Sequence, residues 1–364
     1  MKIGIITHIH ENDNYGGTLQ AFALQSLLET WGHQPFFVNC SVHRRPVYWK
    51  RLLEKPIREI QRMRRYRRFI PFWKRFIRID PQGNRSFEEL FQNPTPTDIY
   101  ICGSDQIWAD GWPKDPQFRR FAFADFGGDS VRRISYAPGW STREIESPLS
   151  EEIRRSLGRF DALSARERAG VDLMRDLGFE STNVLDPTLL FDQDFWSQFV
   201  SPSKKYENIL FLPKYRWKTE VKWKPIVRKI VQEKGLNPLV PSSEAPFEFP
   251  LSNQMVTPEE WLTAIAQSKF VLTNSFHATV FAILFHRPFA VMKLAQRYEG
   301  ANARFETLLG QLGLENRLLT AQNDILNIVS APIDWADVDA RLSEMRAFSL
   351  NWLRNALETS QEDV

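Results

Sequence analysis

Residues 272–288, LTNSFHATVFAILFHRP, set the expectation for the fold. The apolar run 270–273 predicts a buried strand, and Ala278 to Phe285 predicts a buried helix. Ser275 is then the expected N-cap, which puts His277 in the first helical turn. Ligands of open α/β sheets bind where a strand ends and a helix begins, and helix N-termini attract anions. His277 is therefore expected to face an anionic substrate, the alternative being a packed core histidine.

The same alternation of strand, loop and helix extends in both directions from this stretch. At the N-terminus, a strand over residues 2–8 leads through the loop HENDNYGG into a helix with helical apolar spacing. A second series of strands and helices begins after a Ser-Pro-Ser-Lys-Lys interruption near Pro202. We expect two α/β domains with parallel sheets, over residues 1–200 and 201–335, followed by a C-terminal helix over residues 336–358.

The composition limits the class of protein. The chain has 364 residues, of which 43% are hydrophobic, enough for two globular domains. No run reaches the roughly eighteen apolar residues of a spanning helix, and the N-terminus has no signal-peptide cleavage pattern. The cytoplasm is therefore the expected compartment. Cys40 and Cys102 are expected to be buried thiols rather than a disulfide framework.

Residues 44–78 form a basic insertion in the first domain. They contain fourteen Lys and Arg against two Glu, interleaved with aromatic residues at helical spacing, whereas the rest of the chain is net acidic. Three interpretations compete: a solvated helical face, an anionic membrane surface and a nucleic-acid footprint. No nucleic-acid-binding module accompanies the segment, so nucleic acid is not expected as a partner. On a membrane, Trp49, Phe72 and Trp73 would lie at the headgroup level.

Seven ordered stretches together resemble the polysaccharide pyruvyl transferase family, from residue 12 to about residue 314. They are NDNYGGTLQAFALQSLL, DIYICGSDQIW, ISYAPGW, LSARERAGVDLMRDLG, VLDPTLLFD, LTNSFHATVFAILFHRPF and NARFETLLGQLGL. The resemblance implies two facing Rossmann-like domains of the glycosyltransferase-B type. It also implies transfer of an enolpyruvyl unit from phosphoenolpyruvate to hydroxyls of a cell-surface glycan precursor, giving a pyruvate ketal. Such an acceptor, an oligosaccharide or a lipid-linked glycan, would place the enzyme in the cytoplasm or peripherally on the inner membrane face.

The resemblance aligns His277 with the family's functional histidine, and this chemistry needs a general acid. Histidine suits that role because its reference pKa is about 6.5. Some members have an Arg-Leu pair before this histidine, where this chain has Ser275 and Phe276. The missing cation must therefore come from elsewhere or be absent. Besides Ser275, the candidates for donor binding in the C-terminal domain are Lys293, Arg297, Asn302 and Arg304.

Arg166 is a further donor-binding candidate, reaching the cleft from the first domain. The alternative for Arg166 is a structural ion pair, and for Arg304 a surface charge. On the acceptor side, the strand-to-helix turn offers Asn14, Gly16, Gly17 and Gln20, although Gly-Gly before a helix is often just a tight turn. The GSDQ loop offers Ser104 and Asp105, which would otherwise cap a helix.

Asp186, which precedes a proline, is expected to be structural. His8 and His10 alternate on a strand end, but no cluster of cysteines or carboxylates completes a ligand set, so no metal is expected. No cofactor is expected either, since phosphoenolpyruvate is the donor substrate. Two rival functions remain: a nucleotide-sugar glycosyltransferase of the same architecture, and a non-catalytic member that binds glycan.

Overall fold

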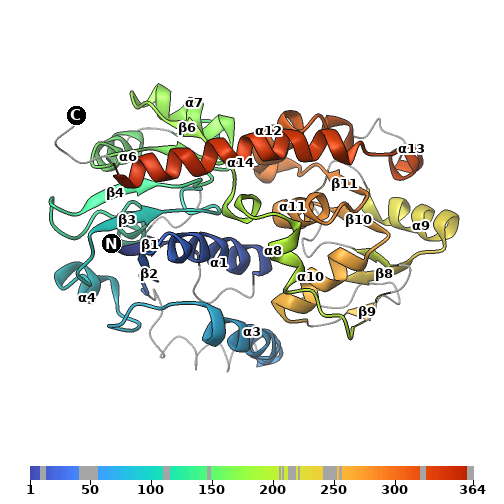
Figure 1. The fold of residues 1–364 in the computed structure, drawn as a ribbon, viewed down its shortest axis with the longest axis horizontal. Coiled ribbons are helices and arrows are strands. Elements are labelled where there is room, and N and C mark those ends of the chain that lie inside the picture. Colours follow the sequence, from blue (N-terminus) through green and yellow to red (C-terminus); the bar gives the residue numbers. More distant parts are fainter. Residues whose placement is uncertain are drawn as a thin grey trace.

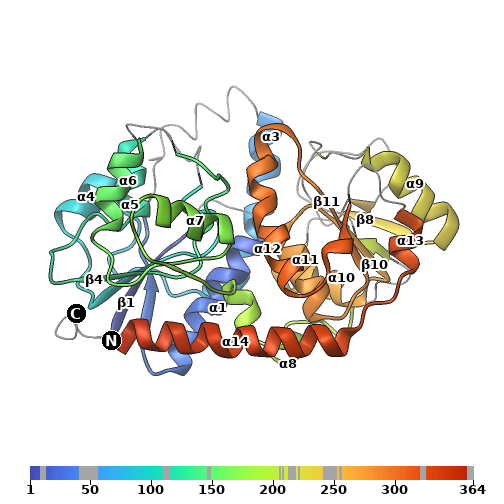
Figure 2. The ribbon, with the colours of Figure 1, turned by 90° about the horizontal axis from the view of Figure 1, so that it is seen from above.

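The described strands form a four-stranded and a six-stranded parallel sheet that lie side by side, together with one short two-stranded pair (Figures 1 and 2). In this computed structural model, the residues described are 1–8, 14–40, 56–109, 115–145, 149–204, 206, 209–211, 219, 222–240, 252–253, 256–319 and 325–358. The division into domains at about residue 200 stays a prediction. The strands nonetheless fall on either side of it, since β6 ends at Asn183 and β7 begins at Ile209.

The first sheet has the strand order β2-β1-β3-β4, with every pair parallel. Its strands are β1 (Lys2–Ile6), β2 (Gln34–Phe37), β3 (Ile99–Cys102) and β4 (Arg132–Ser135). A short pair, β5 (Ser164–Ala165) and β6 (Thr182–Asn183), continues beside β4 through a bridge between Ile134 and Ala162. The helices of this half are α1 (Tyr15–Thr30), α3 (Pro56–Phe76), α4 (Phe87–Gln92), α5 (Pro116–Ala122), α6 (Leu149–Leu157) and α7 (Arg168–Asp176).

The second sheet has the order β12-β11-β10-β7-β8-β9, and its strands are also all parallel. They are β7 (Ile209–Phe211), β8 (Asn237–Val240), β9 (Ser252–Asn253), β10 (Phe270–Thr273), β11 (Phe289–Met292) and β12 (Leu318–Leu319). Its helices are α9 (Trp223–Lys234), α10 (Pro258–Gln267), α11 (Phe276–Leu284), α12 (Ala303–Gln311) and α13 (Ile325–Ser330). The strand expected over residues 270–273 is confirmed with the same bounds.

Short helical segments and one long helix join the two halves. The segments η1 (Pro187–Leu190) and α8 (Gln193–Ser197) precede β7, whereas η2 (Gln296–Asn302) and η3 (Glu315–Arg317) flank α12. The last helix, α14 (Trp335–Glu358), runs back from the second half across the first (Figure 2). The Arg132 guanidinium donates to the carbonyls of Ala356 and Leu357, which satisfies the C-terminal carbonyls of α14.

Helix α1 lies where the two halves meet. It contacts α10 and α11 of the second half as well as β2 and η1. Thirteen of its sixteen residues are buried, which fits a helix whose apolar side chains face in all directions. Because α1 begins at the carboxyl end of β1 and α11 at that of β10, the two helix starts are brought together.

Helix α3 of the basic insertion packs its aromatic side chains into the core. Phe69 and Phe72 are each 1% exposed, and the ring of Phe72 contacts Phe22 of α1 edge-on. The Trp73 indole donates to Thr18 Oγ1 at 3.2 Å. The prediction that Phe72 and Trp73 lie at the headgroup level is therefore wrong, because these rings bind α3 to α1. Trp49 lies outside the described residues.

Cys40 and Cys102 are buried and carry free thiols, as expected. Burial raises the pKa of the Cys40 thiol to about 12. Among the residues described, no helix combines the length and apolar character needed to cross a bilayer.

Candidate active site

His277 lies in the first turn of α11, at the carboxyl end of β10. Ser275 is the N-cap as predicted, and its hydroxyl accepts a hydrogen bond from the backbone N–H of Ala278 at 3.5 Å. The histidine is only 5% exposed. Its Nε2 lies 3.5 Å from Asp186 Oδ2 and has no hydrogen-bond partner within the described residues. The imidazole is therefore buried beside a carboxylate from the other half of the chain.

Asp186 is held as a carboxylate by several donors. Its Oδ1 accepts from the N–H and hydroxyl of Thr188, at 3.0 and 2.7 Å, and thereby caps η1. Its Oδ2 accepts from Ser104 Oγ and Arg166 Nη1, both at 3.1 Å. Burial alone would raise the pKa of Asp186, but His277, Arg166 and the hydrogen bonds hold it well below its usual value. The expectation that Asp186 is structural was incomplete, since it also contacts His277.

Arg166 directly follows β5 and is surrounded by three carboxylates. Its Nη1 lies 3.1 Å from Asp186 and 3.6 Å from Asp105, and its Nε lies 3.6 Å from Glu167. Only 2% of its side chain is exposed. Gly139 leaves room for the guanidinium, because a Cβ there would lie 2.6 Å from Arg166 Nη2. Arg166 Nη2 and Glu167 Oε2 are buried without a hydrogen-bond partner in the described part of the chain, as expected of groups that bind a ligand.

Asp105 completes the cluster from the loop after β3. Its φ is +59°, an uncommon left-handed conformation for a residue other than glycine. Asn14 Nδ2 donates to Asp105 Oδ2 at 3.4 Å. Burial would raise the pKa of Asp105, but electrostatic interactions with His277, Arg166, His8 and Arg304 lower it. Asp105 is no helix cap, since the next described helix begins at Pro116.

Gly16 is the point at which the two halves touch at the site. A Cβ on Gly16 would lie 2.1 Å from His277 Nδ1, so only glycine lets α1 approach the imidazole this closely. Gly17 has a different neighbour, since its Cβ would lie 2.9 Å from Asn14 Nδ2. The Gly-Gly pair is thus more than a tight turn, because its first glycine forms the surface on which His277 packs.

Phe276 occupies the place next to His277 where the family resemblance suggests an aliphatic residue. The guanidinium carbon of Arg166 lies 4.5 Å from the Phe276 ring centroid, and that of Arg304 lies 5.9 Å from it. Both distances are in the range of cation–π contacts. The ring therefore holds an arginine from each half next to His277, in a chain that has no arginine at position 275.

Other predicted residues lie near the cluster but bind within the protein. Gln20 is fully buried; its amide donates to Thr7 and to the carbonyl of Gly17 and accepts from the N–H of Ser104. Ser104 is also fully buried and donates to Asp186, so it orients that carboxylate. The Asn302 amide is paired with both backbone groups of Leu294. This geometry favours positioning roles for these three residues over direct contact with a substrate.

Two further donor candidates lie apart from His277 or cannot be placed. Lys293 forms an ion pair with Glu306 at 3.1 Å. The side chain of Arg297 lies outside the described residues. Glu167, which the sequence did not single out, accepts from the N–H groups of Trp140 and Ser141 at 2.6 and 3.3 Å. The sequence feature that could have identified Glu167 is its position next to Arg166, because an acidic and a basic residue are adjacent there at a strand end.

The histidines near the N-terminus do not form a metal centre in the part that is described. His8 Nε2 lies 3.2 Å from the carbonyl of Gln106, and its ring stacks on Phe118. His10 lies outside the described residues. No group of three or more His, Cys, Asp or Glu residues suited to a metal ion occurs among the residues with described positions.

The family model for polysaccharide pyruvyl transferase matches residues 14–294. The chain belongs to this family. The match begins at Asn14 and includes Asp105, Arg166, Asp186 and His277, whereas Arg304 follows its end. The chain is accordingly an enzyme, a transferase of the pyruvyl transferase family. No curated protein matches its sequence.

Several solved structures share this architecture. The complex of S. aureus MnaA with UDP has a TM-score of 0.55 and 14% identity, covering 98% of this chain and 96% of its own. A putative UDP-N-acetylglucosamine 2-epimerase from Listeria monocytogenes gives 0.53 and 12%, covering 100% and 97%. The UDP-GlcNAc 2-epimerase of Neisseria meningitidis, bound to UDP-GlcNAc, gives 0.51 and 11%, covering 98% and 99%. At these identities the likeness shows the fold, two Rossmann-like domains of the glycosyltransferase-B type.

Proposed function

We propose that the enzyme transfers the enolpyruvyl unit of phosphoenolpyruvate to two hydroxyls of a cell-surface glycan precursor, forming a pyruvate ketal. Beyond family membership, the proposal rests on the buried cluster in which Asp186 adjoins both His277 and Arg166. Arg166 Nη2 is buried there without a hydrogen-bond partner within the described chain. Such atoms are costly unless a ligand satisfies them.

The donor would bind to positive charges from both halves. Phosphoenolpyruvate carries a phosphate and a carboxylate, which need fixed cations and N–H donors. Arg166 and Arg304 flank Phe276, and the N-terminus of α11 adds the positive end of its dipole. Arg166 and Arg304 would thus supply the charge that an arginine before the histidine supplies in some members.

The proton balance of the reaction requires a general acid. The donor methylene carbon gains one proton, its C2 forms bonds to both acceptor oxygens, and the C2–O bond to phosphate breaks. Two hydroxyl protons leave: one replaces the proton delivered to the methylene, and the other leaves with phosphate. His277 would deliver the first proton, while the anionic Asp186 stabilises the imidazolium from the Nε2 side. Nδ1 packs against Gly16, so a donor would reach this nitrogen only if α1 and α11 separated.

A nucleotide-sugar glycosyltransferase is the rival function on this architecture. The similar structures carry UDP or UDP-GlcNAc according to their descriptions, but at 11–14% identity they share only the fold. Thermal unfolding with phosphoenolpyruvate or with UDP-GlcNAc separates the two functions. A ligand at a hundred times its dissociation constant adds about 2.7 kcal/mol to the free energy of unfolding. Stabilisation by UDP-GlcNAc alone would favour the glycosyltransferase.

The catalytic role of His277 is tested by His277→Ala, with His286→Ala as the matched control. His286 follows the other end of α11 and pairs with Asp339. In cells that lack the native gene, we expect the His277→Ala variant to restore little pyruvate ketal to the surface glycan. Its turnover should fall roughly 10²- to 10⁴-fold, as expected for loss of general acid catalysis. Stabilisation by phosphoenolpyruvate should persist, and ketal content equal to that of the control would contradict the assignment.

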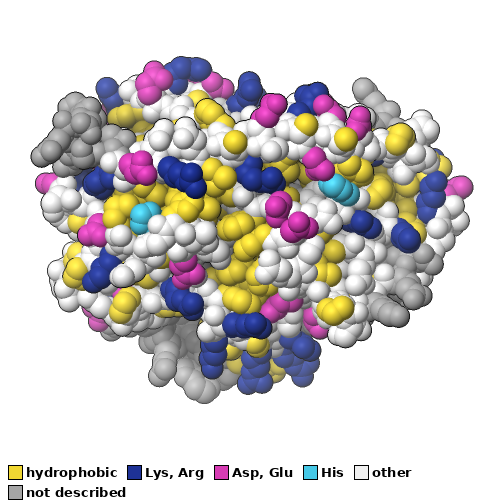
Figure 3. All heavy atoms as spheres, in the orientation of Figure 1, with side chains coloured by type: hydrophobic (Ala, Val, Ile, Leu, Met, Phe, Trp, Pro, Cys, Tyr) yellow, Lys and Arg dark blue, Asp and Glu magenta, His cyan; other side chains and the backbone are white. Residues whose placement is uncertain are grey.

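The proposal extends to where the enzyme works. The exposed edge formed by the end of α3 and the residues just after it is basic, comprising Arg64, Arg67, Arg68, Lys74, Arg75 and Arg78. Figure 3 shows Lys and Arg gathered over α3 at the lower edge of the molecule. This edge would attract an anionic membrane surface, where a lipid-linked acceptor would be presented. The attraction would be electrostatic, because the aromatic residues Phe69 and Phe72 are buried.

A further inference from the structure

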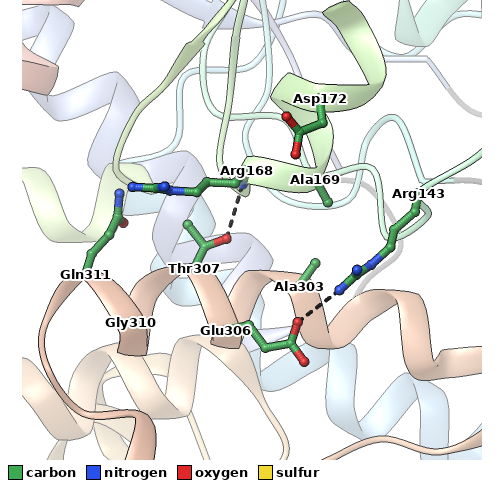
Figure 4. A pocket seen from close by; sticks show the side chains of 9 residues that line it. All are labelled: Arg143, Arg168, Ala169, Asp172, Ala303, Glu306, Thr307, Gly310 and Gln311. Carbon is green, nitrogen blue, oxygen red and sulfur yellow. Dashed lines mark hydrogen bonds and ion pairs between the residues drawn. The ribbon is translucent and has the colours of Figure 1, made fainter. Parts of the chain in front are cut away.

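Three adjoining cavities outside the buried cluster share lining residues, and together they are called the groove. The middle cavity, about 510 Å³, lies between α7 and α12 and is shown in Figure 4. It shares Arg168, Asp172 and Gln311 with a cavity of about 720 Å³ that reaches α14. It shares Arg143 and Glu306 with a cavity of about 550 Å³ beside the loop after β4. Sites for single small ligands measure about 300–1,000 Å³, so three such cavities in a row suit an elongated ligand.

The walls of this groove come from both halves of the enzyme. In Figure 4, Arg168 and Gln311 lie at one side of the middle cavity, and Arg143 and Glu306 lie at the other. Arg143 Nη2 lies 3.1 Å from Glu306 Oε2, and the Arg168 N–H donates to Thr307 Oγ1 at 3.1 Å. Gln311 Nε2 donates to Asn183 Oδ1 at 2.9 Å. The groove therefore follows the seam between α7 and α12.

The chemistry of the lining excludes an anionic ligand and suits a hydroxyl-rich one. Three lining side chains are basic: Arg143, Arg168 and Lys293. Five are acidic: Glu144, Asp172, Glu299, Glu306 and Glu344. Eight of the seventeen uncharged lining residues carry hydroxyl or amide groups, which can both donate and accept hydrogen bonds. The excess of acidic groups repels phosphates and uronates but leaves many partners for sugar hydroxyls.

An exposed aromatic residue lies at the α14 end of the groove. Phe348 is 56% exposed, the highest fraction among the exposed large hydrophobic residues of the described chain. A solvent-facing ring offers an apolar platform, and the C–H face of a sugar ring is a suitable occupant. At the opposite end, Ser141 lines the groove and donates its N–H to Glu167, which adjoins Arg166. Glu167 therefore lies between Ser141 of the groove and Arg166 of the buried cluster.

We propose that this groove binds the acceptor as a chain of several neutral sugar residues, running from Phe348 past Arg168 and Gln311 to Ser141. The identification of this ligand as the acceptor rests on the proposed function. The sugar-binding property itself rests on the adjoining cavities, their net acidic lining with hydroxyl and amide groups, and the exposed ring. The groove would hold the chain along the seam, with the end that receives pyruvate next to the loop of Ser141.

The test is binding to an array of neutral and acidic bacterial oligosaccharides, from monosaccharides to hexasaccharides, without phosphoenolpyruvate. The variants are Phe348→Ala and Gln311→Ala, which remove the ring and a groove amide. Ile79→Ala and Gln92→Ala are matched controls, because both residues are exposed on other parts of the surface. Affinity for neutral chains should rise with their length. Both groove variants should lose roughly three- to tenfold, and the controls and His277→Ala should bind like wild type.

Four results would overturn the inference: no retained oligosaccharide, equal binding of monosaccharides and longer chains, a preference for acidic chains, or unchanged binding by both groove variants. Failure of the proposed function is recognised separately. If neutral chains bind in the groove but phosphoenolpyruvate neither stabilises the enzyme nor yields a ketal, the groove stands and pyruvyl transfer falls.

Discussion

At the residue scale, Asp186 shows how a structural position can also be part of a site. Its Oδ1 caps η1, and its Oδ2 faces Ser104, Arg166 and His277. A single carboxylate thus fixes the start of a helical segment and the charge next to the imidazole. An Asp-Pro pair in a sequence predicts only the first of these roles, because the second depends on contacts from three other strand ends.

The charge of Asp186 should be visible in the pH dependence of stability. Its pKa is depressed in the folded protein, so its contribution is complete above its unfolded-state pKa of about 3.9 and is lost as pH falls through the folded value. Asp186→Asn keeps the shape but removes the charge. By urea unfolding, the variant should be less stable than wild type at pH 5, and the difference should shrink below about pH 4. A difference that stayed constant down to pH 2.5 would show that the carboxylate is not stabilised by its neighbours.

The sequence predicted much of the site because its residues follow strand ends. Asp105, Arg166 and His277 follow β3, β5 and β10, and in each parallel sheet the carboxyl ends of the strands lie at one edge, where ligands bind. The contact between Gly16 and His277 could not be predicted in this way, since it depends on how the two halves pack. The sequence also could not show that the side-chain amides of Gln20 and Asn302 form hydrogen bonds within the protein. An amide that binds a ligand and one that binds the backbone look alike in a sequence.

At the element scale, helix α3 places its aromatic residues and its basic residues on different faces. Its aromatic residues and its basic residues alternate at helical spacing, which fits both a membrane-surface helix and an amphipathic helix of the core. The structure buries Phe69 and Phe72 against α1 and leaves Arg64, Arg67 and Arg68 exposed. Which interpretation applied could not be decided from the pattern, because the apolar face has the same spacing in each case.

The basic edge of α3 can be tested with matched charge changes. The triple variant Arg64→Gln, Arg67→Gln, Arg68→Gln should bind vesicles containing anionic lipid about a hundredfold more weakly than wild type, because each arginine near the surface contributes about 1 kcal/mol. Co-sedimentation at low salt measures this, and added salt should weaken wild-type binding. The control changes Arg154, Arg155 and Arg175, exposed on α6 and α7, to Gln. An equal loss of vesicle binding in both triple variants would mean that only the net charge of the protein matters. No loss of binding in either variant would contradict the proposed attraction to an anionic membrane.

At the scale of the whole molecule, the two halves meet across the site itself. Helix α1 is buried between them, α14 runs from one to the other, and Phe276 lies between an arginine of each half (Figure 2). His277 is buried in this arrangement, so under the proposed function a donor would reach it only if α1 and α11 separated. The packing that completes the cluster would then also be the packing that opens.

Gly16 is the residue through which this closure can be tested. In Gly16→Ala the new Cβ would lie 2.1 Å from His277 Nδ1, so either the imidazole or the two halves must move. Overpacking of this kind costs about 1–3 kcal/mol, and a misplacement of about 1 Å can reduce turnover roughly 10²-fold. Gly158→Ala is the control, because its Cβ would meet nothing closer than 3.6 Å.

The decisive measurement is a double-mutant cycle by urea unfolding with His277→Ala, which removes the ring that Gly16→Ala would strike. The cost of Gly16→Ala should fall in that background, giving a coupling energy above about 0.5 kcal/mol. An equal cost in both backgrounds would mean that α1 and α11 do not meet at this contact in solution.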